Sequence, residues 1–170
     1  MPANYVLLEK IVVGAAMAAS VSFKSIPQTG YTDLKIVMSA RGTAGSDRIN
    51  LKIGFNGSTS TFTRREIYAE TNAFGTESVA DNNVGVFTGG SATVNTFGSA
   101  EINIPNYTSS NYKSFSVDSA SEINTTVFGI WLTAGLWSTG TAISSVELIA
   151  NSGSFAQHST FTLYGVKVEC

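Results

Sequence analysis

Residues 48–68, RINLKIGFNGSTSTFTRREIY, carry the pattern that decides the fold class. From Ile49 to Phe55 every second residue is apolar, which is the period of a strand that buries one face. Asn56-Gly57 follows directly, and both residue types tolerate the positive φ angles of a two-residue hairpin turn. We therefore predict a turn at 56–57, and we expect the strand that ends at Phe55 to pair with a strand running from Phe62 to Tyr68.

The same alternation recurs along the chain without a competing helical pattern. Runs with period two occupy 33–40, 100–104 and 113–117, and clusters of glycine, serine and asparagine separate such runs. No window has a sustained apolar stripe at helical spacing, so helix should be minor. A chain of 170 residues fits one domain. The prediction is an all-β chain: a single domain over 1–170, built as an antiparallel two-sheet sandwich that is jelly-roll-like.

The segment 125–137, TTVFGIWLTAGLW, differs from the other runs because its apolar residues fall on both parities. In a strand, Trp131 would point to one side, into the core, and Ile130 to the other. Such a strand is either covered on both faces within one chain or in contact with another subunit. We favour the second interpretation, with Leu136 and Trp137 meeting a neighbour in a homo-oligomer of cyclic symmetry.

Charge is sparse and nearly balanced. The chain has 10 Lys and Arg against 12 Asp and Glu, and its net charge is −2. Binding to nucleic acid or to an anionic membrane requires a basic field, so neither partner is expected. An apolar run at 11–19 could suggest a signal peptide. However, the charged pair Glu9-Lys10 before this run is itself preceded by the apolar residues 5–8, which is the wrong order for a signal peptide, and we expect a first strand and its turn there. No stretch approaches the roughly 20 apolar residues of a membrane helix.

No catalytic or cofactor site is predicted. The chain has one histidine, His158, and one cysteine, Cys170, which excludes an internal disulfide and a cysteine-based zinc site. His158 lies just before the last expected strand, and no G-x-S-x-G motif supplies a nucleophile. Acidic residues gather in one region, but nothing in the sequence holds two of them together in a cleft, and we interpret them as solvated charges: Glu66, Glu70, Glu77 and Asp81.

The remaining candidates are a polar turn and three aromatic side chains. Asp81–Asn83 has oxygen ligands suited to calcium but lacks the spacing of a known calcium loop, and satisfying backbone hydrogen bonds in a turn is the other reading. The aromatic residues are Trp137 at a strand end, and Tyr107 and Tyr112 beside the loop TSSN. We select them as contacts for a partner protein or a glycan, with packing at the rim of the sandwich as the alternative.

Several longer phrases of the sequence form a recognisable set. The first are YVLLEKIVVGAA at 5–16 and SVSFKSIPQTGYTDLKIVMSARG at 20–42. The others are NTFGSAEINIPNYTSSNYKSFSVDSASE at 95–122, LTAGLW at 132–137 and GSFAQHSTFTLYGVK at 153–167. Together they resemble small β-rich structural proteins of tailed bacteriophages, many of them from marine phages. These phrases cover most of the chain but contain no catalytic or ligand motif, so they leave the position on the particle open.

This resemblance implies a non-enzymatic protein of the virion surface. We expect a capsid decoration or cement protein that binds other virion proteins, above all the major capsid protein, through patches of about 800 Å² per partner. The alternative is a tail-fibre or receptor-binding domain that recognises a host-surface glycan through loop aromatics. A hydrolase of host polysaccharide is disfavoured because the sequence shows no paired acids.

Overall fold

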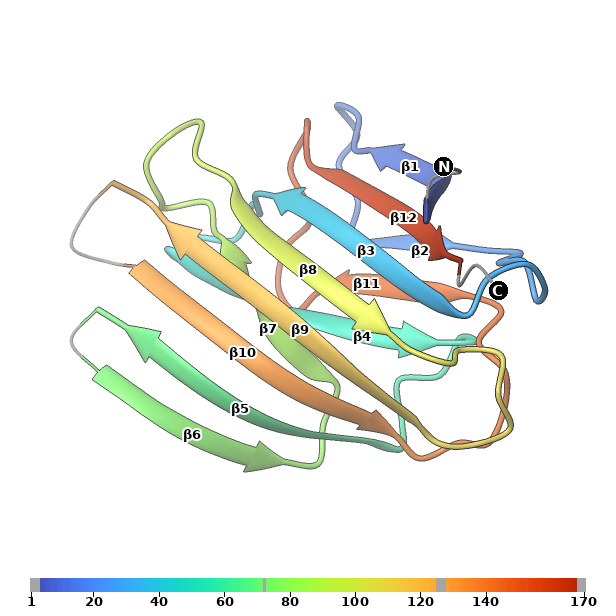
Figure 1. Cartoon of the computed structure of the whole chain (residues 1–170). Helices are drawn as coiled ribbons and strands as arrows, with labels where there is room; N and C mark the ends of the chain where they lie inside the picture. Colours follow the sequence, from blue (N-terminus) through green and yellow to red (C-terminus); the bar gives the residue numbers. More distant parts are fainter. Residues whose placement is uncertain (1–3, 72, 125–127, 168–170) are drawn as a thin grey trace.

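The computed structural model describes residues 4–71, 73–124 and 128–167, and within those residues it contains twelve strands and no helix (Figure 1). The larger of two antiparallel sheets has eight strands, in the order β1 (Tyr5–Val12), β12 (Thr160–Val166), β3 (Asp33–Ala40), β8 (Gly98–Ile104), β9 (Lys113–Glu122), β10 (Phe128–Trp137), β5 (Phe62–Glu70) and β6 (Ala73–Val79). The smaller sheet has four, in the order β2 (Ser20–Phe23), β11 (Val146–Ala150), β4 (Arg48–Phe55) and β7 (Asn83–Thr88). The predicted all-β, jelly-roll-like sandwich of antiparallel sheets is confirmed.

The core lies between the two sheets and follows the period-two pattern. In β4 the alternating side chains from Ile49 to Phe55 are buried, and in β3 those from Leu34 to Ala40 are. Burying one such aliphatic or aromatic side chain stabilises a fold by about 1.5–3 kcal/mol. The N-terminal apolar run at 11–19 contains the end of β1 at Val12 and a turn at 15–16, as expected. Within the described residues, no helix is long and apolar enough to cross a membrane.

The predicted turn at 56–57 is confirmed. Asn56 has a φ of 53° and Gly57 a φ of 76°, and Phe55 and Ser58 exchange both backbone hydrogen bonds across the turn, at 3.0 and 2.9 Å. The Asn56 side chain also ties the turn to a distant loop, because its amide donates to the carbonyl of Ala142 at 2.8 Å and its oxygen accepts from the backbone of Ser144 at 2.8 Å. Side-chain bonds therefore support the strained backbone of this turn.

The strand pairing predicted from that turn is wrong. β4 pairs with β11 and β7 in the small sheet, whereas β5 pairs with β10 and β6 in the large sheet. The chain crosses from one sheet to the other after Ser58, and the rings of Phe55 and Phe62 then meet across the sandwich with centroids 5.4 Å apart. Both side chains had to be buried, and alternation alone does not say whether two buried strands lie side by side or face to face.

Strand β10 has apolar side chains on both of its faces, and one of these faces is exposed. Trp131 and Trp137 point inward and are buried, whereas Ile130 and Leu132 point outward and are 57% and 45% exposed. The strand is central, because β9 pairs with one edge and β5 with the other. The surplus of apolar side chains therefore lies on the outer face of the large sheet and not at Trp137. Val127 and Cys170 lie outside the described residues.

The turn yields a test with a matched pair of variants. Asn56→Gly keeps a residue that tolerates positive φ and removes only the side-chain bonds, so it should cost about 1–2 kcal/mol of unfolding free energy. Asn56→Val additionally forces a β-branched residue into positive φ and should cost a further 1–3 kcal/mol or so. Urea denaturation of both variants measures the difference. Equal losses would show that the backbone conformation at this turn is not constrained.

Candidate functional site

Two of the three aromatic residues selected from the sequence are buried, which corrects that selection. Trp137 is 2% exposed and packs against Phe55 and Phe62, at 5.4 and 6.3 Å between ring centroids. Tyr107 is fully buried, and its hydroxyl donates to the carbonyl of Pro27. Both residues belong to the hydrophobic core between the sheets. Tyr112 is 63% exposed, so a contact role for it stays a prediction.

At the turn Asp81–Asn83 the one carboxylate that calcium would need is already engaged by protein donors. One carboxylate oxygen of Asp81 accepts from Nε of Arg64 at 2.7 Å, and the other accepts from the side-chain amide of Asn83 at 2.8 Å. No group of three His, Cys, Asp or Glu that could hold a metal ion occurs among the residues the structure describes. The second interpretation of this turn, Asx side chains that satisfy local hydrogen bonds, fits the geometry. His158 is exposed and lies before β12 as expected.

The most developed polar site lies where the large sheet extends past the small one. β7 is the edge of the small sheet, and β5 and β6 continue beyond it with no strand of the small sheet behind them (Figure 1). The inner face of this overhang and the edge of the small sheet enclose a groove of about 340 Å³. We call it the inner groove. It is lined by Arg48, Asn50, Arg64, Glu66, Tyr68, Glu70, Thr76, Glu77, Asn83, Gly85, Val86 and Trp131.

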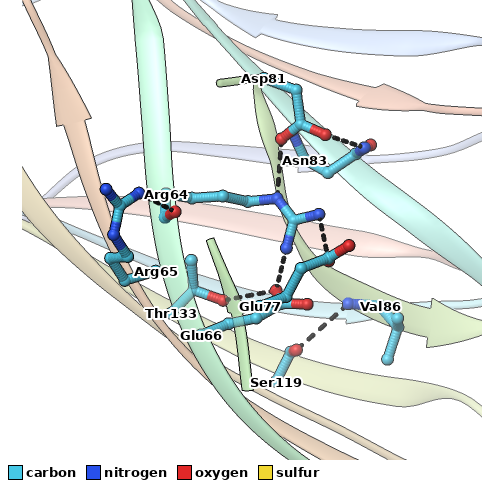
Figure 2. A network of polar contacts seen from close by, with 9 residues as sticks. All are labelled: Arg64, Arg65, Glu66, Glu77, Asp81, Asn83, Val86, Ser119 and Thr133. Atoms are coloured by element: carbon cyan, nitrogen blue, oxygen red, sulfur yellow. Dashed lines mark hydrogen bonds and ion pairs between the residues drawn. The ribbon is translucent and has the colours of Figure 1, made fainter. Parts of the chain in front are cut away.

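Arg64 is the central residue of the overhang. It shares its parity with Phe62, so it points inward, and its side chain is only 7% exposed. Its guanidinium binds three carboxylates, as Figure 2 shows: Glu66 at 2.5 Å, Glu77 at 2.6 Å and Asp81 at 2.7 Å. A buried guanidinium requires such partners, because an unpaired buried charge costs several kcal/mol. The network ties β5, β6 and the start of β7 together where no core holds them.

This network corrects the interpretation of the acidic residues as separate solvated charges. Glu66, Glu77 and Asp81 converge on one cation, and Glu66 also accepts a long hydrogen bond of 3.4 Å from the Thr133 hydroxyl on β10. The sequence did contain a signal. Arg64 and Glu66 follow the apolar Phe62 at intervals of two residues. In a strand these three side chains point to the same face, so burial of Phe62 would place Arg64 and Glu66 on the inner face. The separation of 11 residues between Glu66 and Glu77 gave no such indication.

The network moves the pKa values of its carboxyl groups in opposite directions. Burial raises the pKa of Glu66, and the nearby Glu77 adds to this, although Arg64 opposes the rise. Burial also disfavours ionisation of Asp81, but the hydrogen bonds from Arg64 and Asn83 outweigh it and lower the pKa of that carboxyl below its usual 3.8. The pKa of Arg64 itself is raised, since its three partners outweigh its own burial. The guanidinium therefore stays charged at every pH at which the protein folds.

A second ion pair closes the other side of the groove. Arg48 at the start of β4 pairs with Glu70 at the end of β5, and its guanidinium lies 5.4 Å from the ring centroid of Trp131. The ring of Tyr68 stacks beside Trp131, with centroids 6.5 Å apart and planes 17° from parallel. Gly75 on β6 makes room for Tyr68, because an added Cβ would lie 2.7 Å from the tyrosine oxygen. Tyr68 and Trp131 together form an aromatic wall of the groove, with Arg48 packed against the Trp131 ring.

Comparison with known proteins adds little to this description. No family model and no curated protein matches the chain. Among solved structures the chain is similar to galectin LEC-6 of Caenorhabditis elegans, with 9% sequence identity and a TM-score of 0.28 over 97% of this chain and 96% of the galectin. A TM-score this low does not establish a shared fold, and no property of the galectin is carried over to this chain.

The opposite pKa directions predict opposite effects of two isosteric changes. Asp81 stabilises the fold above its usual pKa, and this contribution is lost as the pH falls through its lowered folded pKa, so Asp81→Asn should destabilise at neutral pH and reduce the loss in acid. Glu66 has a raised pKa, so its ionisation above about pH 4.5 works against folding, and Glu66→Gln should be neutral or stabilising at pH 7 or so. Urea denaturation across this pH range measures both. A large loss with both variants at neutral pH would contradict the assignment.

Proposed function

We propose that the chain is a non-enzymatic structural protein of a phage virion surface, a capsid decoration or cement protein that works through protein–protein contacts. Its partners would be other virion proteins, the major capsid protein above all, together with copies of itself. The support for a virion role is the resemblance of its sequence phrases to small structural proteins of tailed bacteriophages. The support for a contact role is a surface feature of the large sheet.

That feature is a band of exposed apolar side chains on the outer face of the overhang. We call it the outer apolar band, and it consists of Ile67, Phe74, Ile130 and Leu132. Strand register makes it continuous, since Leu132 is opposite Ile67, and Ile130 and Phe74 are both opposite Ala69. Phe74 is 91% exposed. Contiguous apolar patches of this kind on a protein surface mark contact sites.

The band is favourably placed for a contact between proteins. Strand β6 is the edge of the large sheet and is exposed along most of its length. An edge strand leaves backbone donors and acceptors unpaired, and natural proteins block such edges or use them for assembly. The only charged residue of β6 is Glu77, and it lines the inner groove. The β6 residues on the same parity as exposed Phe74, which are Thr76 and Ser78, are uncharged.

This mechanism needs no catalytic group. A decoration protein stabilises a shell by adding interface area in the assembled state, and that binding shifts the equilibrium towards the assembled form. The carboxylates of the overhang that bind Arg64 already have an ionic partner. The alternative function, a receptor-binding domain for a host glycan, is favoured by a different feature, the inner groove.

Removal of the exposed ring tests the contact role. Phe74→Ser should weaken attachment to capsids assembled without the protein at least tenfold, because large aromatic side chains dominate the energy of such interfaces. Folding should be little affected, since the ring is 91% exposed. Co-sedimentation with capsids measures attachment. Val94→Ser is the matched control, because Val94 is also an exposed apolar residue, at 77%, and lies outside the band. Unchanged attachment of Phe74→Ser would contradict the role of the band.

A further inference from the structure

The inner groove has the size and position of a ligand site. Its volume of about 340 Å³ falls at the lower end of the range for small-molecule sites, roughly 300–1,000 Å³. It lies where the large sheet overhangs β7, and it opens to solvent beside Glu77, whose side chain is 47% exposed. A ligand of one or two rings is therefore the largest that the groove accommodates.

The charges of the groove nearly cancel and select against ionic ligands. Arg48 and Arg64 carry two positive charges, and three glutamates line the same space: Glu66, Glu70 and Glu77. Each arginine is already bound to at least one of these carboxylates, so no cation is left to hold a phosphate or a carboxylate of a ligand. No metal-binding cluster occurs in the described ranges either. A neutral ligand with many hydrogen-bonding groups fits this environment.

Donors and acceptors alternate around the groove. Arg48 and Asn50 supply N–H groups from β4, while Glu70 and Glu77 supply carboxylate oxygens from β5 and β6. The side-chain oxygen of Asn83 is buried and has no hydrogen-bond partner, although the amide nitrogen of the same side chain donates to Asp81. A buried acceptor without a partner costs about 1–3 kcal/mol. A hydroxyl group that reached this wall would remove that cost.

An aromatic wall completes the site. Tyr68 and Trp131 stand side by side along the groove; Arg48 lies over the Trp131 ring, and Gly75 leaves the room that the Tyr68 ring occupies. Tyrosine and tryptophan combine an apolar body with a polar edge, which suits a ligand that has both C–H and O–H surfaces. Because these side chains are held before any ligand arrives, binding costs little further ordering.

We infer that the inner groove binds a neutral saccharide of one or two rings. Hydroxyl groups are both donors and acceptors, so one sugar ring can bind Asn50, the Arg48–Glu70 pair and Glu77 with its own hydroxyl groups. The C–H face of the ring lies against Tyr68, the more accessible of the two aromatic side chains, since Trp131 is only 6% exposed. This inference gives the receptor-binding alternative a site. It is independent of the capsid contact, because the outer apolar band lies on the opposite face of the same strands.

The two tryptophans make the test internally controlled. Trp131 lines the groove, whereas Trp137 is buried in the core away from it. In amide and indole N–H spectra, titration with neutral hexoses, N-acetylhexosamines and their disaccharides up to about 10 mM should shift the Trp131 indole signal and leave that of Trp137 in place. This range detects a Kd of about 1 mM. Amides of Glu70, Glu77 and Asn83 should shift along with Trp131.

A pair of glutamate variants shows whether the groove is responsible. Glu77→Ala should weaken binding of the sugar with the largest shifts about tenfold or more, since it removes a charged acceptor. Glu101→Ala is the matched control, because Glu101 is 42% exposed and pairs with Lys35 at 2.6 Å, much as Glu77 is 47% exposed and pairs with Arg64 at the same distance. The control should bind the sugar with unchanged affinity.

Three outcomes would overturn the inference. The first is the absence of shifts at Trp131 with every sugar of the panel. The second is equal loss of binding in Glu77→Ala and Glu101→Ala, which would place the sugar elsewhere. The third is a shift of Trp131 caused by calcium or spermidine alone and not by the sugars, which would make the groove a cation site. None of these outcomes bears on capsid attachment, which the Phe74 variant tests.

Discussion

The constraint on which the rest of the structure depends is the unequal size of the two sheets. Eight strands face four, so the inner face of β5 and β6 has no opposing strand to bury it. An apolar inner face at this place would be exposed, and a charged one would lack partners. The chain meets this constraint with Arg64, each of whose three guanidinium nitrogens binds one carboxylate. Ionic contacts replace the hydrophobic core at this end of the sandwich.

The same constraint produces both surfaces to which a function is assigned. On the inner side, the uncovered sheet leaves a groove that charged and aromatic side chains fill only in part. On the outer side, the strands that extend past the sandwich expose Ile67, Phe74, Ile130 and Leu132. A sheet that ended at β10 would have neither surface. Contact with other virion proteins and recognition of a saccharide are therefore two proposals about opposite faces of one overhang.

The alternation of apolar residues predicted which side chains are buried more accurately than it predicted which strands pair with one another. The buried face of β4 and the turn at 56–57 followed from local patterns, because strand period and positive φ are properties of neighbouring residues. The pairing of β5 did not, since Phe55 and Phe62 would be buried equally well beside or across from one another. Trp137 was assigned to the surface from its place at a strand end, although it shares the inward parity of Trp131. Of the three partners of Arg64, Glu66 could be expected from its shared parity on the same strand, but no spacing in the sequence indicates that Glu77 and Asp81 meet them.

Hydrogen exchange of the Arg64→Ala variant tests the central claim most directly. If the ionic network orders the overhang, amides of β5 and β6 should exchange at least about tenfold faster than in the unmodified protein, while those of β3 and β8 in the middle of the large sheet keep their protection. Unchanged protection of β5 and β6 would show that backbone pairing alone orders them. Uniform loss of protection across both sheets would show that Arg64 supports the whole fold and not one end of it.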